Sequence, residues 1–167
     1  MSDLETAAKS LLLPWIDGTR TRLLYDQQQM IATWAVKTTM MLQYTPMHPA
    51  GAVIPAAHYD ALGTQRTRPP DGVEVLIGLE PDKAPGALFG LRPMAVVQQG
   101  WSGLAPALGR YMGYEATLIA RGLVLNVLGH IGPPGTQMTK EFGFDHDLAL
   151  NQIWPVRSSG GILLPTA

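Results

Sequence analysis

Residues 73–79 read Val-Glu-Val-Leu-Ile-Gly-Leu, and this stretch decides the fold class. Apolar side chains alternate along it, as they do on a half-buried β-strand. One face of the strand would carry Val73, Val75, Ile77 and Leu79. Leu76 lies on the opposite face, which indicates that this face is partly covered too. Apolar residues recur at helical spacing before the stretch and at strand spacing after it. The sequence therefore predicts an α+β fold, with two N-terminal helices plus a short helix packed on a mostly antiparallel sheet of about four strands.

Two helices are predicted ahead of this strand. The first begins with a capping box formed by Ser2 and Glu5 and ends at Pro14 and the Asp17-Gly18 pair. The second is capped by Asp26. Its main apolar stripe would consist of Met30, Trp34, Thr38 and Met41, flanked by Ile31, Ala35 and Leu42. The short third helix starts at Pro55 and ends at Gly63.

Three more strands are predicted in the second half of the chain. Residues 88–97 contain Gly90 and Pro93, which places this strand at an edge or makes it bulged. Residues 117–128 read as one long strand with a bend at Gly122, and residues 151–156 as the last strand. We expect a single domain over residues 1–167, with a helical part over 2–66 and a strand-rich part over 72–167.

The composition excludes several classes of function. Of the 167 residues 46% are hydrophobic, which is typical of a folded chain, but only 15% are charged. A partner covering part of the surface would explain so few charges, as would a surface rich in Thr, Gln and Ser. The net charge of −1 provides no overall attraction for nucleic acid. Cysteine is absent, so disulfides, thiolate catalysis and cysteine zinc sites are excluded.

The expected location is the cytoplasm. The first turn carries Asp3 and Glu5 where a secretory signal would have basic residues. No apolar stretch approaches the length of a membrane helix, so we expect a soluble protein that does not contact a membrane.

Two stretches resemble a known family. One is Met-Ser-Asp-Leu-Glu at 1–5, followed by Leu-Leu-Pro at 12–14 and Ile-Asp-Gly at 16–18. The other is Ile-Ala-Thr-Trp-Ala-Val-Lys-Thr at 31–38, followed by Met-Met-Leu at 40–42. They are similar to poorly characterised bacterial and phage proteins that are labelled HNH-endonuclease-like. The match covers the first forty-odd residues well, and residues 117–124 resemble a late strand of the family more weakly.

The resemblance implies a fold and an association with nucleic-acid enzymes. In longer members a Cys/His zinc segment ending in Cys-Asn-Asn-Gly-Trp precedes the Met-Ser-Asp-Leu-Glu stretch, whereas this chain begins at that methionine. We therefore expect the zinc-binding and nuclease module to be missing. No catalytic residue is carried over from the family.

The tightest group of acids with a histidine is Asp145, His146 and Asp147. If these residues lie in a turn, all three side chains can approach one hard cation, or His146 can serve as a general base. The simpler interpretation is a solvated turn in which one aspartate caps the segment that follows. A cysteine-free metal-dependent enzyme is thus one alternative for the function.

Two arginine pairs are candidates for phosphate contacts. Arg20 and Arg22 lie in the turn between the first two helices, and Arg66 and Arg68 precede a double proline. The simpler interpretation is solvated loop charge. The functional one is a nucleic-acid-associated remnant, or one half of a split HNH-type nuclease.

No complete catalytic set is present in the sequence. Residues 132–136 begin like a phosphate-binding loop, but Lys and Ser/Thr are missing from the places that such a loop requires. The serines lack a nucleophile elbow. We expect no cofactor, and the interpretation we favour is a non-catalytic one.

The favoured hypothesis is an interaction or accessory module of phage or mobile-element type. It would bind another macromolecule, most simply a protein, and self-association into a homo-oligomer is compatible with it. Eight methionines and a low surface charge fit burial of apolar area against a partner. The residues predicted for this surface are Met40 and Tyr44 at the end of the second helix.

Overall fold

A computed structural model describes most of the helices and the central sheet. The described residues are 3–17, 19, 22–45, 53–79, 86–94, 96–98, 113–131, 136–138, 150–156 and 162–163. Within them the fold is α+β, as the sequence predicts, and the main sheet has five strands, one more than expected.

The three helices are α1 (Asp3–Ile16), α2 (Tyr25–Leu42) and α3 (Ala56–Gln65). The main sheet has the order β3-β5-β6-β2-β8, and every neighbouring pair in it is antiparallel. Its strands are β2 (Val73–Leu79), β3 (Ala87–Met94), β5 (Gly113–Ala120), β6 (Leu123–His130) and β8 (Asn151–Trp154). Two further pairs are β1 (Arg22–Leu23) with β9 (Ile162–Leu163), and β4 (Val96–Gln98) with β7 (Thr136–Met138).

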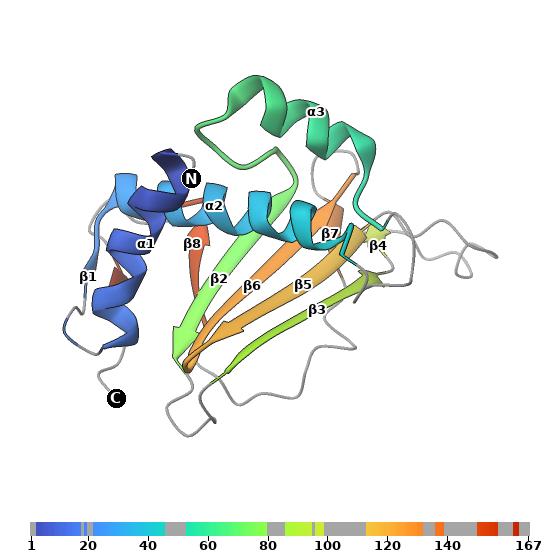
Figure 1. The fold of residues 1–167 in the computed structure, drawn as a ribbon. Coiled ribbons are helices and arrows are strands. Elements are labelled where there is room, and N and C mark those ends of the chain that lie inside the picture. Colours follow the sequence, from blue (N-terminus) through green and yellow to red (C-terminus); the bar gives the residue numbers. More distant parts are fainter. Residues whose placement is uncertain are drawn as a thin grey trace.

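The core lies between the helices and one face of the sheet. Figure 1 shows α1, α2 and α3 on the same side of the sheet, with α2 lying across it. Alternate residues of β2 point toward α2, as the opening stretch of the sequence predicts, and Val75 and Ile77 are fully buried. Ile31 and Ala35 of α2 are fully buried as well.

Two details of α1 and α2 differ from the prediction. Pro14 does not end α1, because the helix continues to Ile16 and the Asp17 N–H still bonds the Leu13 carbonyl at 3.0 Å. Trp15 is 1% exposed and belongs to the hydrophobic core, so its burial stabilises this last turn. Asp26 does not cap α2. The N-cap is Leu24, whose N–H donates to Gln27 Oε1 at 3.1 Å.

The buried face of α2 is rotated from the predicted stripe. Its fully or nearly buried residues are Gln28, Ile31, Ala32, Thr33, Ala35, Val36, Thr39 and Met40. Met30, Trp34 and Thr38 are only half-buried, and Met41 is 58% exposed. Apolar side chains occupy a wide arc around α2. The helical periodicity of the sequence therefore did not identify which part of that arc is buried.

The third helix extends past its predicted end. Pro55 precedes α3 as its N-cap, Gly63 lies inside the last turn, and the helix ends at Gln65. Arg66 then takes a left-handed conformation with φ of 52°, and its N–H bonds the Leu62 carbonyl at 2.9 Å.

The predicted long strand over residues 117–128 is a hairpin. Strands β5 and β6 pair antiparallel across a two-residue turn formed by Arg121 and Gly122. Both residues have positive φ, 49° and 82°, as the tight turn between twisted strands requires. The glycine therefore reverses the chain instead of bending a strand, and this adds the fifth strand.

The predicted strand over residues 88–97 is divided into β3, which ends at Met94, and β4, which pairs with β7 in a separate sheet. Strand β3 lies at an edge of the main sheet, and β8 covers most of the predicted last strand. Among the described residues, no helix combines the length and the apolar character needed to cross a membrane.

Candidate functional site

The C-terminal half of α2 and the last turns of α3 enclose an apolar depression, which we call the α2–α3 groove. Its volume is about 480 Å³. The lining residues are Leu4 of α1; Thr33, Lys37, Met40, Met41 and Tyr44 of α2 and its end; and Tyr59, Leu62, Gly63 and Arg66 of α3 and its end. Met41 and Tyr44 are 58% and 70% exposed, so large apolar groups border the groove while remaining in contact with solvent.

Hydrogen bonds beneath the groove fix its two walls. Gln43 Nε2 donates to the Tyr59 hydroxyl at 2.8 Å, and this hydroxyl donates to the Met40 carbonyl at 3.3 Å. Gln43 Oε1 accepts the N–H groups of Val53 and Ile54 at 2.9 and 2.8 Å. One buried glutamine thus joins the end of α2 to the chain entering α3, and the groove is formed before anything binds.

Two tyrosines lie at one end of the groove. The rings of Tyr44 and Tyr59 are 6.0 Å apart and inclined at 53°. Burial raises the pKa of Tyr59 well above its ordinary value, and the neighbouring Tyr44 raises it further. The Tyr59 phenol is therefore neutral at physiological pH, and the two rings offer aromatic surface to a ligand.

Two of the described residues that line this groove are charged, and both are basic. Lys37 Nζ lies 3.2 Å from Glu5 Oε1, so α1 already supplies a counter-charge to it. Arg66 is exposed, and its Nε donates to the Gly63 carbonyl at 3.2 Å, which holds the guanidinium near the end of the groove. The rim consequently has a positive charge at Arg66.

A second depression, the α1–sheet groove, lies between α1 and the end of the sheet. It has a volume of about 590 Å³. Its wall residues are mostly apolar and include Leu12, Leu13 and Ile16 of α1, Trp34 of α2, and Leu88, Phe89, Leu118 and Leu123 of the sheet. Leu13 and Leu88 on opposite sides are 39% and 62% exposed. Because Lys37 lines one groove and its partner Glu5 lines the other, this ion pair lies between the two.

The inner side of α3 rests on a histidine–tyrosine contact. His58 Nδ1 is 3.2 Å from the Tyr114 hydroxyl, and the two rings meet edge to face with centroids 5.7 Å apart. Burial lowers the pKa of His58, a hydrogen bond with the His130 backbone partly opposes this, and the nearby His130 ring lowers it again. Burial likewise raises the pKa of Tyr114. At neutral pH the contact joins two uncharged rings.

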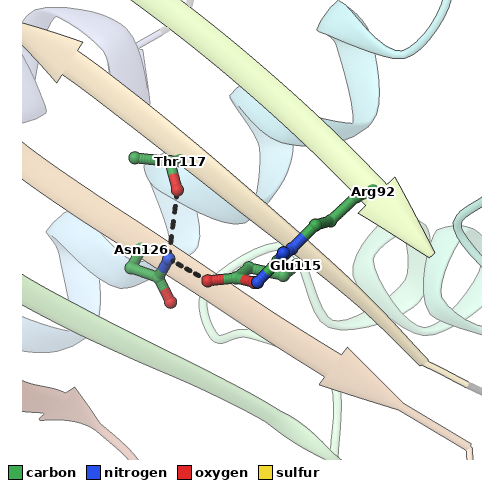
Figure 2. A network of polar contacts seen from close by, with 4 residues as sticks. All are labelled: Arg92, Glu115, Thr117 and Asn126. Carbon is green, nitrogen blue, oxygen red and sulfur yellow. Dashed lines mark hydrogen bonds and ion pairs between the residues drawn. The ribbon is translucent and has the colours of Figure 1, made fainter. Parts of the chain in front are cut away.

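The face of the sheet turned away from α2 carries a polar network, shown in Figure 2. Arg92 of β3 donates through Nε to Glu115 Oε2 at 2.7 Å, and its Nη2 contacts the same oxygen. Asn126 Nδ2 of β6 donates to Glu115 Oε1 at 2.9 Å and to the Thr117 hydroxyl at 3.1 Å. Every oxygen of the buried carboxylate is thus occupied, so the network joins three strands and offers no reactive group.

Comparison with protein-family models, with curated proteins and with solved structures finds no match for this chain. The relationship to HNH-endonuclease-like proteins accordingly remains an expectation from the sequence.

The structure separates the two residues predicted for an interaction surface. Tyr44 is exposed on the rim of the α2–α3 groove, whereas Met40 is 4% exposed and belongs to the core beneath it. The exposed methionine at this place is Met41. The sequence pattern assigned Met41 to the core because it falls on the stripe that was predicted to be buried.

The predicted basic residues lie in different parts of the fold. Arg66 and Arg68 follow α3, and Arg68 donates to Gln65 Oε1 at 2.7 Å and lies 3.5 Å from Asp71. Arg22 is exposed on β1, and Arg20 lies outside the described residues. The described structure therefore brings together the second arginine pair only.

The predicted metal cluster of Asp145, His146 and Asp147 lies outside the described residues. Among the residues that are described, no three His, Asp or Glu side chains gather closely enough to hold a metal ion.

Sequence reasoning missed Tyr59 and Gly63 as parts of a groove. Only the three-dimensional approach of α3 to α2 identifies them.

Proposed function

We propose that this chain is a non-catalytic interaction module that binds another protein through its apolar grooves. The observation that carries the proposal is the exposure of Met41 and Tyr44 around the α2–α3 groove, and of Leu13 and Leu88 around the α1–sheet groove. Large apolar side chains grouped around a depression, with few charges between them, are typical of protein-binding surfaces. An accessory role in a phage or mobile element, which the family resemblance implies, is part of the same proposal.

The low charge of the whole sequence supports this function. Charged residues are 15% of the chain, against about 25% in an average soluble protein. Aromatic residues and methionine are enriched where proteins meet, and charged residues are depleted there. Burial of one or both grooves against a partner would remove mostly apolar surface from water.

Quantitative affinity capture tests the proposal. The tagged chain and two double variants are exposed to an extract of the source cells, and retained proteins are quantified. Met41→Ser with Tyr44→Ser removes apolar surface at one groove, and Leu13→Ser with Leu88→Ser removes it at the other. Ala56→Ser with Ala57→Ser changes two exposed positions of α3 that line neither groove. It serves as the matched control.

We expect a small set of proteins retained by the unchanged chain and by the control. At least one groove variant should retain about tenfold less, since truncating a central aromatic or apolar contact costs 1 kcal/mol or more. Equal retention by all four forms would contradict the proposal. A second copy of the chain is also a candidate protein partner. Light scattering on the same four forms of the chain measures this self-association.

A further inference from the structure

Gly63 lies on the wall of the α2–α3 groove, and neither its backbone conformation nor the packing of the described residues around it requires a glycine. Gly63 lies in the last turn of α3, where glycine stabilises a helix less than alanine by up to about 1 kcal/mol. Its φ is not positive, so the backbone does not require glycine there. Apart from the backbone of its own helix and its chain neighbours, a Cβ atom placed on Gly63 would meet no atom of the described residues within 4 Å.

The open space over Gly63 is continuous with the groove. Gly63 lines the groove beside Leu62 and Arg66 of the same helix end. The exposed Met41 of α2 and Tyr44, just after α2, line it as well. A missing side chain at such a place allows the backbone of another molecule to approach closely. Small residues have this effect where two helices cross.

We propose that the α2–α3 groove binds an amphipathic α-helix of a partner protein, with apolar side chains facing the groove and acidic side chains facing Arg66. This inference rests on the proposed function and names its surface and partner chemistry. A helix lying between two helices is a common mode of peptide recognition, in which residues at i, i+3, i+4 and i+7 enter the groove. The partner backbone would cross α3 at Gly63.

The charges of the rim favour an acidic partner. Among the described residues that line the groove, the two charged ones are basic, and Lys37 is already paired with Glu5. Arg66 therefore supplies the charge that this part of the structure presents to a partner. The guanidinium of Arg66 keeps two terminal nitrogens beyond the Nε that bonds Gly63, and carboxylates accept from such nitrogens. Complementary charge sets the orientation of the bound helix.

The test uses two fluorescein-labelled 18-residue helical peptides and the full chain. Both peptides carry leucines at i, i+3, i+4 and i+7. One has glutamates beside this stripe, and the other has lysines in the same places. Fluorescence anisotropy measures binding to the chain and to four variants: Gly63→Phe, which fills the groove; Ala57→Phe, which adds the same ring to α3 outside the groove; Arg66→Glu; and Met41→Glu.

The chain should bind the acidic peptide about fivefold more tightly than the basic one, as expected for one partly exposed ion pair. Gly63→Phe and Met41→Glu should each weaken binding about tenfold or more, Ala57→Phe should change it less than about twofold, and Arg66→Glu should reverse the preference between the peptides. Circular dichroism confirms that each variant is folded. Because Met41 is exposed, its variant tests the groove even if Gly63→Phe does not fold.

Several results would overturn the inference. Binding of neither peptide at 1 mM would do so, as would equal binding by Gly63→Phe and the unchanged chain. If self-association or binding of a single-stranded DNA is lost in Gly63→Phe while no peptide binds, the groove holds a different occupant. The two proposals can fail separately. If no peptide binds, but the Leu13→Ser, Leu88→Ser variant loses partners in the capture experiment, the chain binds proteins through the α1–sheet groove and the α2–α3 groove has no part in it.

Discussion

The hydroxyl of Tyr114 lies 3.2 Å from Nδ1 of His58, and this contact joins α3 to strand β5 of the main sheet. Tyr114 is fully buried and His58 is 3% exposed. His58 is the one side chain of α3 that is buried, so the position of this helix depends on it. Because α3 forms one wall of the α2–α3 groove, this contact positions the wall together with the hydrogen bonds of Gln43 and Tyr59.

Removing the His58 ring should destabilise the protein more than removing the Tyr114 hydroxyl. His58→Ala leaves a cavity and an unpaired hydroxyl, and should lower the free energy of unfolding by about 3 kcal/mol. Tyr114→Phe removes only the hydrogen bond and should cost about 1 kcal/mol. Urea denaturation measures both values. If the double variant His58→Ala, Tyr114→Phe loses the full sum, the two side chains do not interact, and the assigned contact is wrong.

The lowered pKa of His58 predicts lower stability in mild acid. The unfolded chain takes up a proton at His58 near pH 6.5, and the folded chain does so only at lower pH. The associated stability is complete above pH 6.5 and falls as the pH decreases, by at most about 1.4 kcal/mol per unit. The titratable groups that act on His58 are Tyr114, which contacts it, and His130, which shifts its pKa.

The control for this effect is His58→Gln, which keeps a polar side chain that does not titrate. Urea denaturation at pH 7.5 and pH 5.5 should show a larger loss for the unchanged chain than for the variant. Carboxylates titrate equally in both proteins and cancel in the comparison. Identical losses would mean that His58 is not buried in its neutral form.

Two glycine-to-alanine substitutions should have opposite effects. A Cβ on Gly129 would lie 2.3 Å from the Tyr114 ring, which cannot move away because it is fully buried. Gly129→Ala should therefore lower the free energy of unfolding by about 2 kcal/mol or more. Gly63→Ala meets open space within a helix and should raise it by about 0.5 kcal/mol. Thermal and urea unfolding of both variants measure the contrast, and a destabilised Gly63→Ala would contradict the account of the groove wall.

The network of Figure 2 predicts an asymmetry between its two charged members. Glu115 is 6% exposed and Arg92 is only half-buried. Among the contacts in Figure 2, Arg92→Ala leaves the buried carboxylate with a hydrogen bond from the uncharged Asn126 amide and no counter-charge, and should cost about 3 kcal/mol. Glu115→Gln retains a hydrogen-bonding group of the same shape and should cost about 1–2 kcal/mol. Urea denaturation would contradict this assignment if Glu115→Gln proved the more damaging change.

The fold class could be predicted from the sequence because its signals are local. Alternation over residues 73–79 identifies a strand whatever its neighbours, and Gly90 with Pro93 correctly placed β3 at an edge. The hairpin of β5 and β6 was missed because its turn is Arg121-Gly122, which lacks the usual Asn-Gly or Asp-Gly signal. Without that signal the two strands read as one.

The candidate site was harder to predict because it depends on how elements pack. Tyr44 was recognised at the end of α2, but its neighbour Tyr59 lies fifteen residues further on and meets it only when α3 folds back. Gly63 was interpreted as a helix end because glycine commonly follows helices. The hydrogen bond from the Arg66 N–H to the Leu62 carbonyl shows that the helix continues past Gly63.

The central claim is that this chain functions by contact through its apolar grooves, and site-specific photocrosslinking tests it most directly. A benzophenone amino acid replaces Tyr44 at the groove rim or, as the control, Ala57 on α3 outside both grooves. After irradiation in the source cells, we predict a discrete covalent protein adduct from position 44, absent from position 57 and lost when Gly63→Phe is added. No adduct from position 44, or the same adducts from both positions, would contradict the claim.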